Sequence, residues 1–250
     1  HPPEKYNTAC IVVFVDLANS TRLTEQYGKG FSEHIRHLMR LVEDQVLIQR
    51  GCPIKQLGDG LMCAFDLWQV KESGYQAFDR ALQFAQKALR MFSEDRKYEP
   101  LALRVGLHYG DIVLSETPHF DLFGDTVNTA ARIEAANKYY HTQIMASDAF
   151  VTRTRFQDYL REVDRVKVMG RDQPLTLYTW DTGFAKHKQK QHRLPYEQAL
   201  AAYRQGDWDA AKSMLSRAQS QDPLCIPLLQ RLQSTDNIPE HWQGIWSLDK

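Results

Sequence analysis

The stretch Lys55-Gln-Leu-Gly-Asp59-Gly-Leu-Met-Cys-Ala-Phe65 places Gly-Asp-Gly between two hydrophobic runs. A tight turn needs residues that accept positive φ, so Asp-Gly between apolar runs is a strong signal for a β-hairpin. A second apolar run, Ile11–Val15, is typical of a buried strand and ends in Asp16. The sequence therefore predicts two carboxylates, Asp16 and Asp59, at the ends of neighbouring strands. Such a pair can hold two hard divalent ions, a common way to bind a nucleoside triphosphate.

Composition sets the broad class of protein. Lysines and arginines balance aspartates and glutamates at 31 each in 250 residues, so bulk charge gives no argument for binding nucleic acid or a membrane. The four cysteines have neither a paired nor a metal-ligand spacing, which favours reduced thiols and a cytoplasmic location. No apolar run approaches the roughly 20 residues of a membrane span, so we expect no membrane contact by this chain. Because the chain starts at His1 rather than Met, we expect either a fragment of a longer protein, such as one with a sensor or membrane portion upstream, or a processed product.

Hydrophobic spacing predicts helices and strands that alternate around one mixed sheet. The predicted helices are a short one ending near Tyr27 and others over 30–49, 73–93, 124–137 and 147–152. The predicted strands, besides the hairpin, are 8–16, 101–109, 112–115, 143–146, 160–168 and 175–180. Strands 101–109 and 112–115 are expected to form a pair turned at Gly110-Asp111, with residues 120–123 as a loop before the next helix. His108, in the first strand of that pair, is expected to be a satisfied structural group.

The last quarter of the chain has a different composition. Residues 182–194 are polar and basic and are interpreted as a linker, after which 195–250 is expected to be a small all-α extension. It resembles a single tetratricopeptide-like helix pair, on the offsets of Gly206, Ala211, Leu215, Ala218 and Pro223. One repeat cannot bury its own apolar face, so it must pack on something, and Trp242 and Trp246 are candidates.

Five stretches together resemble the catalytic domain of class III nucleotidyl cyclases, the adenylyl and guanylyl cyclase family. They occur in the family's order and cover roughly residues 8–180, so residues 1–181 are expected to be the catalytic domain. The stretches are Phe14-Val-Asp16-Leu-Ala-Asn-Ser-Thr21, Lys55-Gln-Leu-Gly-Asp59-Gly, Leu103-Arg-Val-Gly-Leu-His-Tyr-Gly110, Phe123-Gly-Asp-Thr-Val-Asn128-Thr-Ala-Ala-Arg132-Ile-Glu and Gln143-Ile-Met-Ala-Ser147.

The resemblance implies a fold and a set of site residues. The fold would be α/β (α+β), with a ferredoxin-like βαββαβ core and extra strands. Asp16 and Asp59 would bridge two Mg²⁺ or Mn²⁺ ions, Asn128 would orient the ribose, and Arg132 would stabilise the transition state. The alternative for Arg132 is a surface salt bridge to a carboxylate near it in sequence, Glu134 or Asp125.

Phosphate and base contacts complete the predicted site. The helix-start amides of the loop after the first strand suit phosphate oxygens, although they are equally explained by helix capping; these residues are Leu17, Ala18, Asn19, Ser20 and Thr21. Adenine presents an acceptor beside a donor, and Lys55 has only donors whereas ionised Asp121 has only acceptors. Guanylyl cyclases of the family usually have an acidic and a small residue at these two positions, so the pair favours ATP.

One position departs from the family pattern. Where the family usually has Val-Lys-Gly, with a lysine that holds the terminal phosphates, this chain has Val168-Met169-Gly170. If the strand continues through this region, Lys167 and Arg171 share a face with position 169 and are expected to contact the phosphates instead.

The leading hypothesis is an adenylate cyclase that works as a homodimer with two composite sites, because this one chain carries both halves of a site. One alternative is a cyclase-like domain kept for nucleotide binding or protein interaction. Another is a cyclase of a different nucleotide, which the pair Lys55 and Asp121 disfavours.

Overall fold

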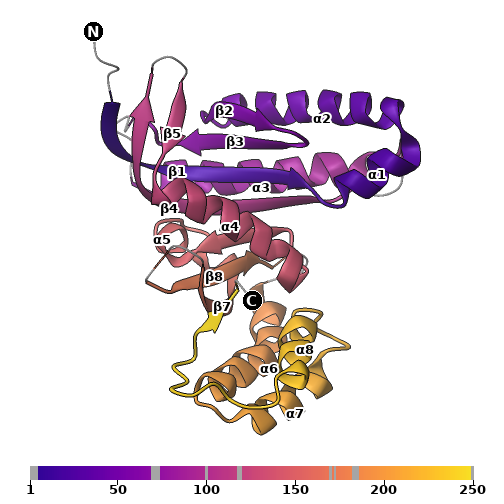
Figure 1. The fold of residues 1–250 in the computed structure, drawn as a ribbon, viewed down its shortest axis with the longest axis vertical. Helices are drawn as coiled ribbons and strands as arrows, with labels where there is room; N and C mark the ends of the chain where they lie inside the picture. Colours follow the sequence, from indigo (N-terminus) through magenta and orange to yellow (C-terminus); the bar gives the residue numbers. More distant parts are fainter. Residues whose placement is uncertain are drawn as a thin grey trace.

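The computed structural model describes residues 5–68, 74–98, 101–116, 120–168, 171, 173–181 and 186–248. The first half of the chain contains β1 Lys5–Leu17, α1 Ser20–Tyr27, α2 Lys29–Ile48, β2 Cys52–Leu57, β3 Gly60–Phe65, α3 Gln76–Glu94, β4 Leu103–Ser115 and β5 Asp121–Phe123 (Figure 1). The second half contains α4 Asp125–Tyr140, β6 Ile144–Ser147, α5 Asp148–Val151, the 3₁₀ turn η1 Gln157–Tyr159, β7 Leu160–Lys167, β8 Leu175–Trp180, α6 Lys186–Arg204, α7 Trp208–Ala218, α8 Cys225–Ser234 and β9 Trp246–Ser247. Among the described residues no helix is both long enough and apolar enough to cross a membrane.

The described strands form one mixed sheet in the order β2-β3-β1-β4-β6-β8-β7-β9, with β5 paired to β4. Neighbouring strands of the first four are antiparallel, with helices between β1 and β2 and between β3 and β4. This is the ferredoxin-like βαββαβ arrangement with extra strands, as the resemblance predicted. The central position of β1 places Asp16 in the middle of the sheet rather than at an edge.

β1 is buried on both faces, as its continuous apolar run predicted. Its odd-numbered residues from Ile11 to Leu17 belong to a cluster with the apolar faces of α2 and α3, and Cys10 and Val12 belong to a second cluster that includes Ala130 of α4. Successive strand residues point to opposite faces of a sheet, so Asp16 points to the same side as Cys10 and Val12, which is the side of α4.

The hairpin of β2 and β3 is present, and Leu57 pairs with Gly60 around the two-residue loop Gly58-Asp59. The positive φ falls on Gly58, at +62°. A glycine at the first of the two loop positions is typical of one of the turn types whose twist matches that of the flanking strands. The prediction of the hairpin is confirmed, and the loop sits one residue earlier than the Asp-Gly pair suggested.

The prediction of a strand pair turned at Gly110-Asp111 is wrong, because β4 runs unbroken from Leu103 to Ser115. Its full length pairs with β1, and the ladder satisfies backbone groups that a turn would expose. Residues 121–123, expected to be a loop, form β5 and pair with the end of β4. Gly110 does not form a turn; it lets Thr126 of α4 pack close to β4, since a Cβ at position 110 would lie 2.6 Å from Oγ1 of Thr126.

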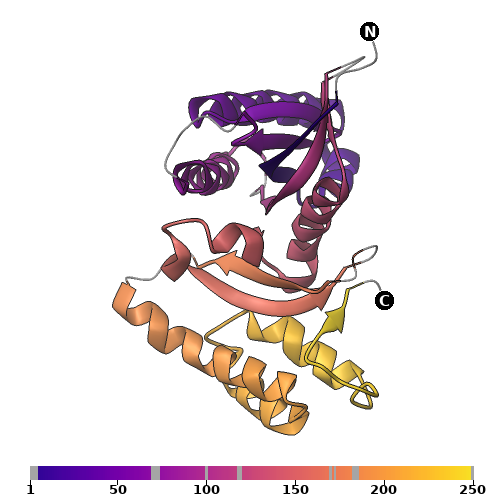
Figure 2. The ribbon, with the colours of Figure 1, turned by 90° about the vertical axis from the view of Figure 1, so that its left-hand side faces the viewer.

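The C-terminal helices pack on the outer strands of the same sheet, where Figure 2 shows them as a layer beneath β7 and β8. One hydrophobic cluster joins α4 and strands β6, β7 and β8 to α6, α7 and α8, including Tyr140, Leu177, Tyr203 and Leu228. Trp242 packs at the margin of this cluster, as expected for a helix pair that cannot bury its own face. Helix α6 already begins at Lys186, inside the range interpreted as a linker. The extension is not all-α as expected, because its strand β9 pairs with β7 and joins the sheet.

We predict that Gly106→Ala loosens the contact between β4 and α4. A Cβ at 106 would lie 2.4 Å from the Glu134 nitrogen and 2.8 Å from the Ala130 carbonyl oxygen, so the helix must shift. Overpacking of this kind costs about 1–3 kcal/mol of unfolding free energy, measurable by urea denaturation. Gly74→Ala is the control, because nothing lies within 4 Å of its Cβ position. Equal midpoints for both variants would contradict this account.

Candidate active site

The two predicted metal carboxylates lie on either side of one close backbone approach. Asp16 of β1 pairs with Gly60 of β3, and Asp59 immediately precedes Gly60. A Cβ at position 60 would lie 2.6 Å from the Val15 carbonyl oxygen and 3.3 Å from Oδ1 of Asp16. Glycine at 60 therefore leaves space beside the Asp16 carboxylate. Asp59 is half-buried and has no hydrogen-bond or ion-pair partner among the described residues.

Asp16 is held from β4 by Arg104, the residue opposite it in the β1–β4 ladder. Nη2 of Arg104 donates to Oδ2 of Asp16 at 2.8 Å, and Nε of Arg104 lies 3.2 Å from Oε1 of Glu134 on α4. Burial, and secondarily the charge of Asp16, raises the pKa of Glu134 to about 7, although Arg104 acts in the opposite direction. Asp16 is thus linked through one guanidinium to the helix that carries Asn128 and Arg132.

These residues fit hard divalent ions. The hydrogen bond from Arg104 uses Oδ2 of Asp16, so Oδ1 of the same carboxylate is available to an ion. Asp59 has no partner among the described residues. Carboxylate oxygens are ligands that Mg²⁺ and Mn²⁺ prefer. The part of the chain that the structure describes contains no cluster of three or more His, Cys, Asp or Glu side chains suited to a metal. With two protein carboxylates, further ligands would have to come from water or a bound nucleotide, as is usual for Mg²⁺.

The structure brings the predicted base-reading residues together. Nζ of Lys55 on β2 donates to Oδ2 of Asp121 on β5 at 2.5 Å, although 66 residues separate them. The ion pair is partly open to solvent, with side-chain exposures of 44% and 19%. Asp121 is also fixed locally, because its Oδ1 accepts the N–H of Leu122 at 2.8 Å. A donor and an acceptor therefore stand side by side at an accessible position.

Asn128 and Arg132 project from the outward face of α4. The buried face of this helix contains Thr126, Ala130, Ile133 and Asn137, whereas Asn128 is exposed and Arg132 is half-buried. Thus the helix presents both side chains away from the sheet on which it packs.

Arg132 does not form the alternative salt bridge to Glu134 or Asp125. Glu134 faces Arg104, and Asp125 accepts from Oγ1 of Thr129. Among the described residues Arg132 has no hydrogen-bond or ion-pair partner. Its guanidinium therefore remains available to a group outside this part of the chain.

The loop after β1 begins α1 without side-chain capping. Asn19 occupies the N-cap position with φ +60°, but its side chain makes no capping hydrogen bond. The Leu17 side chain is buried, and the Ala18 N–H already donates to the Ala102 carbonyl oxygen at 2.8 Å. The amides of Ser20 and Thr21 are those that a helix start leaves without intrahelical partners.

The two cations suggested as substitutes for a phosphate lysine lie in different surroundings. β7 ends at Lys167, before Arg171, whose N–H donates to the Val168 carbonyl oxygen at 3.2 Å, so the condition that one strand continues through 171 is not met. Lys167 lines a cavity with the C-terminal segment, beside Trp246. Arg171 lies near the start of α4, 3.9 Å from Asp125. Met169 lies outside the described residues.

His108 is a satisfied buried group, as predicted. Its Nδ1 lies 2.7 Å from Oγ of Ser147 and its Nε2 lies 3.3 Å from Nη1 of Arg171. Because Arg171 can only donate, Nε2 must accept and Nδ1 must carry the proton. Burial, and then the charge of Arg171, lowers the pKa of His108 to about 4.

Sequence reasoning missed Arg104, and it considered Glu134 only as a salt-bridge partner of Arg132. Both stand within quoted stretches, and the available signal was a charged residue in the otherwise apolar strand Leu103–Leu107. A buried charge on a central strand needs a partner, but its identity depends on strand register.

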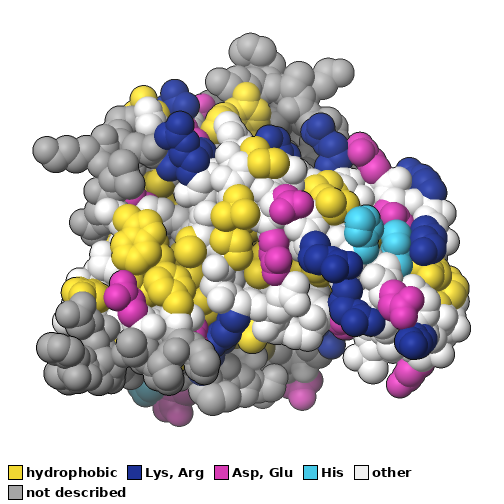
Figure 3. All heavy atoms as spheres, turned by 90° about the horizontal axis from the view of Figure 1, so that it is seen from above, with side chains coloured by type: hydrophobic (Ala, Val, Ile, Leu, Met, Phe, Trp, Pro, Cys, Tyr) yellow, Lys and Arg dark blue, Asp and Glu magenta, His cyan; other side chains and the backbone are white. Residues whose placement is uncertain are grey.

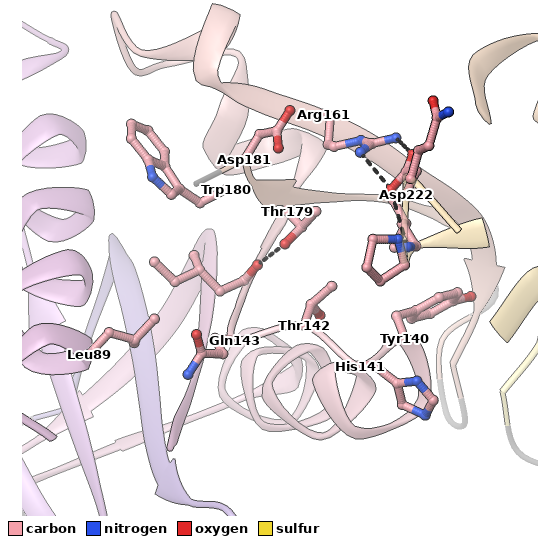
Figure 4. Close-up of a pocket in the computed structure, with 14 residues that line it drawn as sticks. Leu89, Tyr140, His141, Thr142, Gln143, Arg161, Thr179, Trp180, Asp181 and Asp222 are labelled. Atoms are coloured by element: carbon pink, nitrogen blue, oxygen red, sulfur yellow. Dashed lines mark hydrogen bonds and ion pairs between the residues drawn. The ribbon is translucent and has the colours of Figure 1, made fainter. Parts of the chain in front are cut away.

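A separate cavity of about 310 Å³ lies at the other end of α4, where its last residues meet β7, β8 and the loop between α7 and α8 (Figure 4). It is lined by none of the predicted catalytic or metal residues. Around it, Arg161 of β7 forms a buried two-fold hydrogen-bonded ion pair with Asp222.

Comparison with known proteins gives the family. The profile described as "Adenylate and Guanylate cyclase catalytic domain" matches residues 2–181. The chain belongs to this family. Adenylate cyclase 2 of Rhizobium meliloti is 30% identical to it over 69% of this chain and 50% of the relative. An adenylate cyclase of Mycobacterium bovis is likewise 30% identical, over 70% of this chain and 40% of the relative.

Solved cyclase structures share the fold. The adenylyl cyclase CyaB from P. aeruginosa has a TM-score of 0.61 at 18% identity, over 73% of this chain and 98% of that one. The catalytic core of a rhodopsin-guanylyl cyclase with converted specificity, in complex with ATPalphaS, also has a TM-score of 0.61, at 23% identity over 71% and 99%. This cyclase chain spans half or less of the length of the two curated relatives above.

We predict that His108 makes stability fall as pH falls. The pKa of His108 is lower in the folded state than in the unfolded state, so below pH 6.5 the unfolded state binds more protons. The stability that is present above pH 6.5 is therefore lost as the pH falls toward 4. The shift from 6.5 to about 4 corresponds to about 3 kcal/mol. Urea denaturation between pH 7 and 4 should show a shallower pH dependence for His108→Gln than for the parent. The exposed His37→Gln is the control, and parallel curves for parent and His108→Gln would refute the assignment.

Proposed function

We propose that this cyclase domain is an adenylate cyclase, which converts ATP to 3′,5′-cyclic AMP and pyrophosphate in composite sites of a homodimer. The family match supports nucleotide cyclisation, and the Lys55–Asp121 pair is the observation that carries the choice of ATP. The curated relatives named above are adenylate cyclases, which agrees with that choice.

The base would be read by exchange of partners at an existing ion pair. Lys55 donates to the adenine ring nitrogen, and Asp121 accepts from the exocyclic amino group. Guanine has a ring N–H beside a carbonyl oxygen at that edge, so its N–H would face the Lys55 donor and its carbonyl oxygen would face the Asp121 carboxylate. Holding the two side chains together before binding reduces the ordering cost of recognition.

The remaining residues would act on the triphosphate and ribose. Asn128 holds the ribose so that its 3′-hydroxyl is in line with the α-phosphorus, and the planar Arg132 guanidinium stabilises charge on the phosphoryl oxygens. The first amides of α1 and the side chains of Arg171 and Lys167 would bind phosphate oxygens.

Asp16 and Asp59 are the carboxylates that would hold two Mg²⁺ or Mn²⁺ ions, which when bound lower the pKa of the attacking hydroxyl and neutralise triphosphate charge. Arg104 keeps the Asp16 carboxylate oriented and leaves its Oδ1 for coordination.

A homodimer is supported by how one chain distributes these groups. No hydrogen bond or ion pair among the described residues links Asn128 or Arg132 to the carboxylates or to the Lys55–Asp121 pair. Both α4 side chains point outward from their own chain, where a second copy's carboxylates could meet them. Figure 3 shows hydrophobic side chains gathered on the face seen from above. Exposed Leu57 and Phe123 lie two residues from Lys55 and Asp121 respectively, so each shares a strand face with one member of the pair.

We predict complementation between half-sites. Asp59→Ala and Arg132→Ala should each be inactive, and an equal mixture after subunit exchange should recover about one quarter of parental turnover, because half the dimers are mixed and each has one intact site. The matched control mixes Asp16→Ala with Asp59→Ala, which damage the same half-site and should stay inactive. A silent first mixture with demonstrated exchange would exclude the shared site.

We predict that the base preference resides in the ion pair. Parent protein with Mn²⁺ and each of four ribonucleoside triphosphates should give cyclic AMP as the main product by mass spectrometry. Lys55→Glu with Asp121→Cys should reduce kcat/KM for ATP far more than for GTP, since each mismatched polar group costs about 1–3 kcal/mol. The exposed Lys29→Glu is the charge control. Equal losses for both nucleotides would show that these residues do not read the base.

A further inference from the structure

Arg231 of α8 has a side chain that is 1% exposed and forms hydrogen bonds to β7, α4 and α6. Its Nη1 lies 2.6 Å from Oδ2 of Asp164 on β7, and its Nη2 lies 2.9 Å from Oη of Tyr140 at the end of α4. Its Nε donates to Oη of Tyr139 at 2.9 Å, and Nη1 also reaches Tyr203 of α6 at 3.0 Å. All three guanidinium nitrogens are therefore used, two of them on the last two residues of α4.

The bonds around Arg231 form a closed network. Tyr140 donates its hydroxyl proton to Oδ2 of Asp164 at 2.6 Å while it accepts from Arg231, so the three groups satisfy one another. The guanidinium also lies over the rings of Tyr139 and Trp246, with its carbon 5.2 and 4.6 Å from their centroids. Leaving any member of such a buried network unpaired is costly, so the end of α4 is held in one arrangement.

This end of α4 belongs to the same helical stripe as the catalytic residues. Asn128, Arg132 and Tyr139 are spaced by four and seven residues, which places them on one outward face. The other side of the helix is fixed within the cyclase core, where Asn137 Nδ2 donates to the Val105 carbonyl oxygen at 3.0 Å. A small rotation of α4 about its axis would move Tyr139 and Arg132 together.

The C-terminal helices are themselves fixed to the sheet independently of α4. Arg161 and Asp222, both 5% exposed, tie β7 to the loop between α7 and α8 on one side of the cavity in Figure 4. Tyr196 of α6 donates its hydroxyl proton to the Val163 carbonyl oxygen of β7 at 2.6 Å. Helix α8 therefore holds the end of α4 by hydrogen bonds, while the C-terminal helices are themselves bound to β7.

We propose that Arg231 and Tyr140 are positioning residues for catalysis, because α8 fixes the orientation of α4 and so the direction in which Asn128 and Arg132 are presented. This inference rests on the proposed role of Asn128 and Arg132. It gives the C-terminal extension a part in the reaction although it contributes no group to the site.

The test compares two buried tyrosine hydroxyls. Tyr140→Phe removes one of the two hydrogen bonds by which Arg231 of α8 holds α4, and leaves Arg231 paired with Asp164 and Tyr139. Tyr196→Phe removes a hydroxyl of the same kind that ties α6 to β7 and does not touch α4. We expect Tyr140→Phe to lower kcat by about three- to ten-fold with little change in KM for ATP, and Tyr196→Phe to leave kcat unchanged, since small misorientations of catalytic groups are expensive.

Amide hydrogen exchange gives a readout that does not depend on turnover. Residues 125–140 should exchange faster in Tyr140→Phe than in the parent, and at the parental rate in Tyr196→Phe. Tyr139→Phe, which removes an Arg231 contact at an exposed ring, should reproduce the effect in weaker form if Tyr140→Phe folds poorly. Identical exchange of α4 in parent, Tyr139→Phe and Tyr140→Phe overturns the proposal.

Arg132→Ala in the same assays separates the two hypotheses. Full turnover of Arg132→Ala would overturn the proposed function. An inactive Arg132→Ala together with an unchanged kcat for Tyr140→Phe would overturn the positioning role alone. Equal loss of kcat in Tyr140→Phe and Tyr196→Phe would mean that the extension acts only through general stability, which also contradicts the proposal.

Discussion

The antiparallel ladder between β1 and β4 is the constraint on which the rest of the structure depends. It pairs every residue from Lys5 to Leu17 with a partner on β4, so both strands lie in a fixed register at the centre of the sheet. A register slip of one residue would turn Asp16 to the opposite face and separate it from Arg104. The direction in which the Asp16 carboxylate points is thus a consequence of backbone pairing, and the hydrogen bond from Arg104 fixes its rotamer.

Helix α4 connects the two ends of the molecule. It lies directly on β4 at Gly106, which has no side chain to hold the helix away, and Glu134 meets Arg104 at this contact. At its last turn it meets α8 through a buried charged network. Such networks are often no more stabilising than an apolar core, but they accept only one geometry. This makes α4 a rigid element held from both parts of the chain, suited to carrying side chains whose direction matters.

Much of the architecture followed from local patterns. Apolar runs and Gly-Asp-Gly predicted β1, β2 and β3, and helical spacing predicted α2, α3 and α4 with modest errors at the ends. Resemblance to a family added the strand order and the pairing of Lys55 with Asp121, which no local pattern contains. The errors share a cause. Gly110-Asp111 has the composition of a turn, but the neighbouring strand offers an unbroken ladder, and Thr126 occupies the space that a side chain at 110 would need.

The sequence by itself determined most of the helices and strands, the hairpin and the set of chemically capable residues, because turn chemistry and hydrophobic period act over a few neighbours along the chain. Only the tertiary structure decided which of those residues meet. Arg104 reaches Asp16 across 88 positions, and Arg231 reaches Tyr140 across 91, through strand register and helix packing. It also decided that Lys167 lies beside the C-terminal segment, whereas Arg171 lies near the start of α4. Contacts between distant segments depend on the packing of whole elements, and a local pattern carries no record of it.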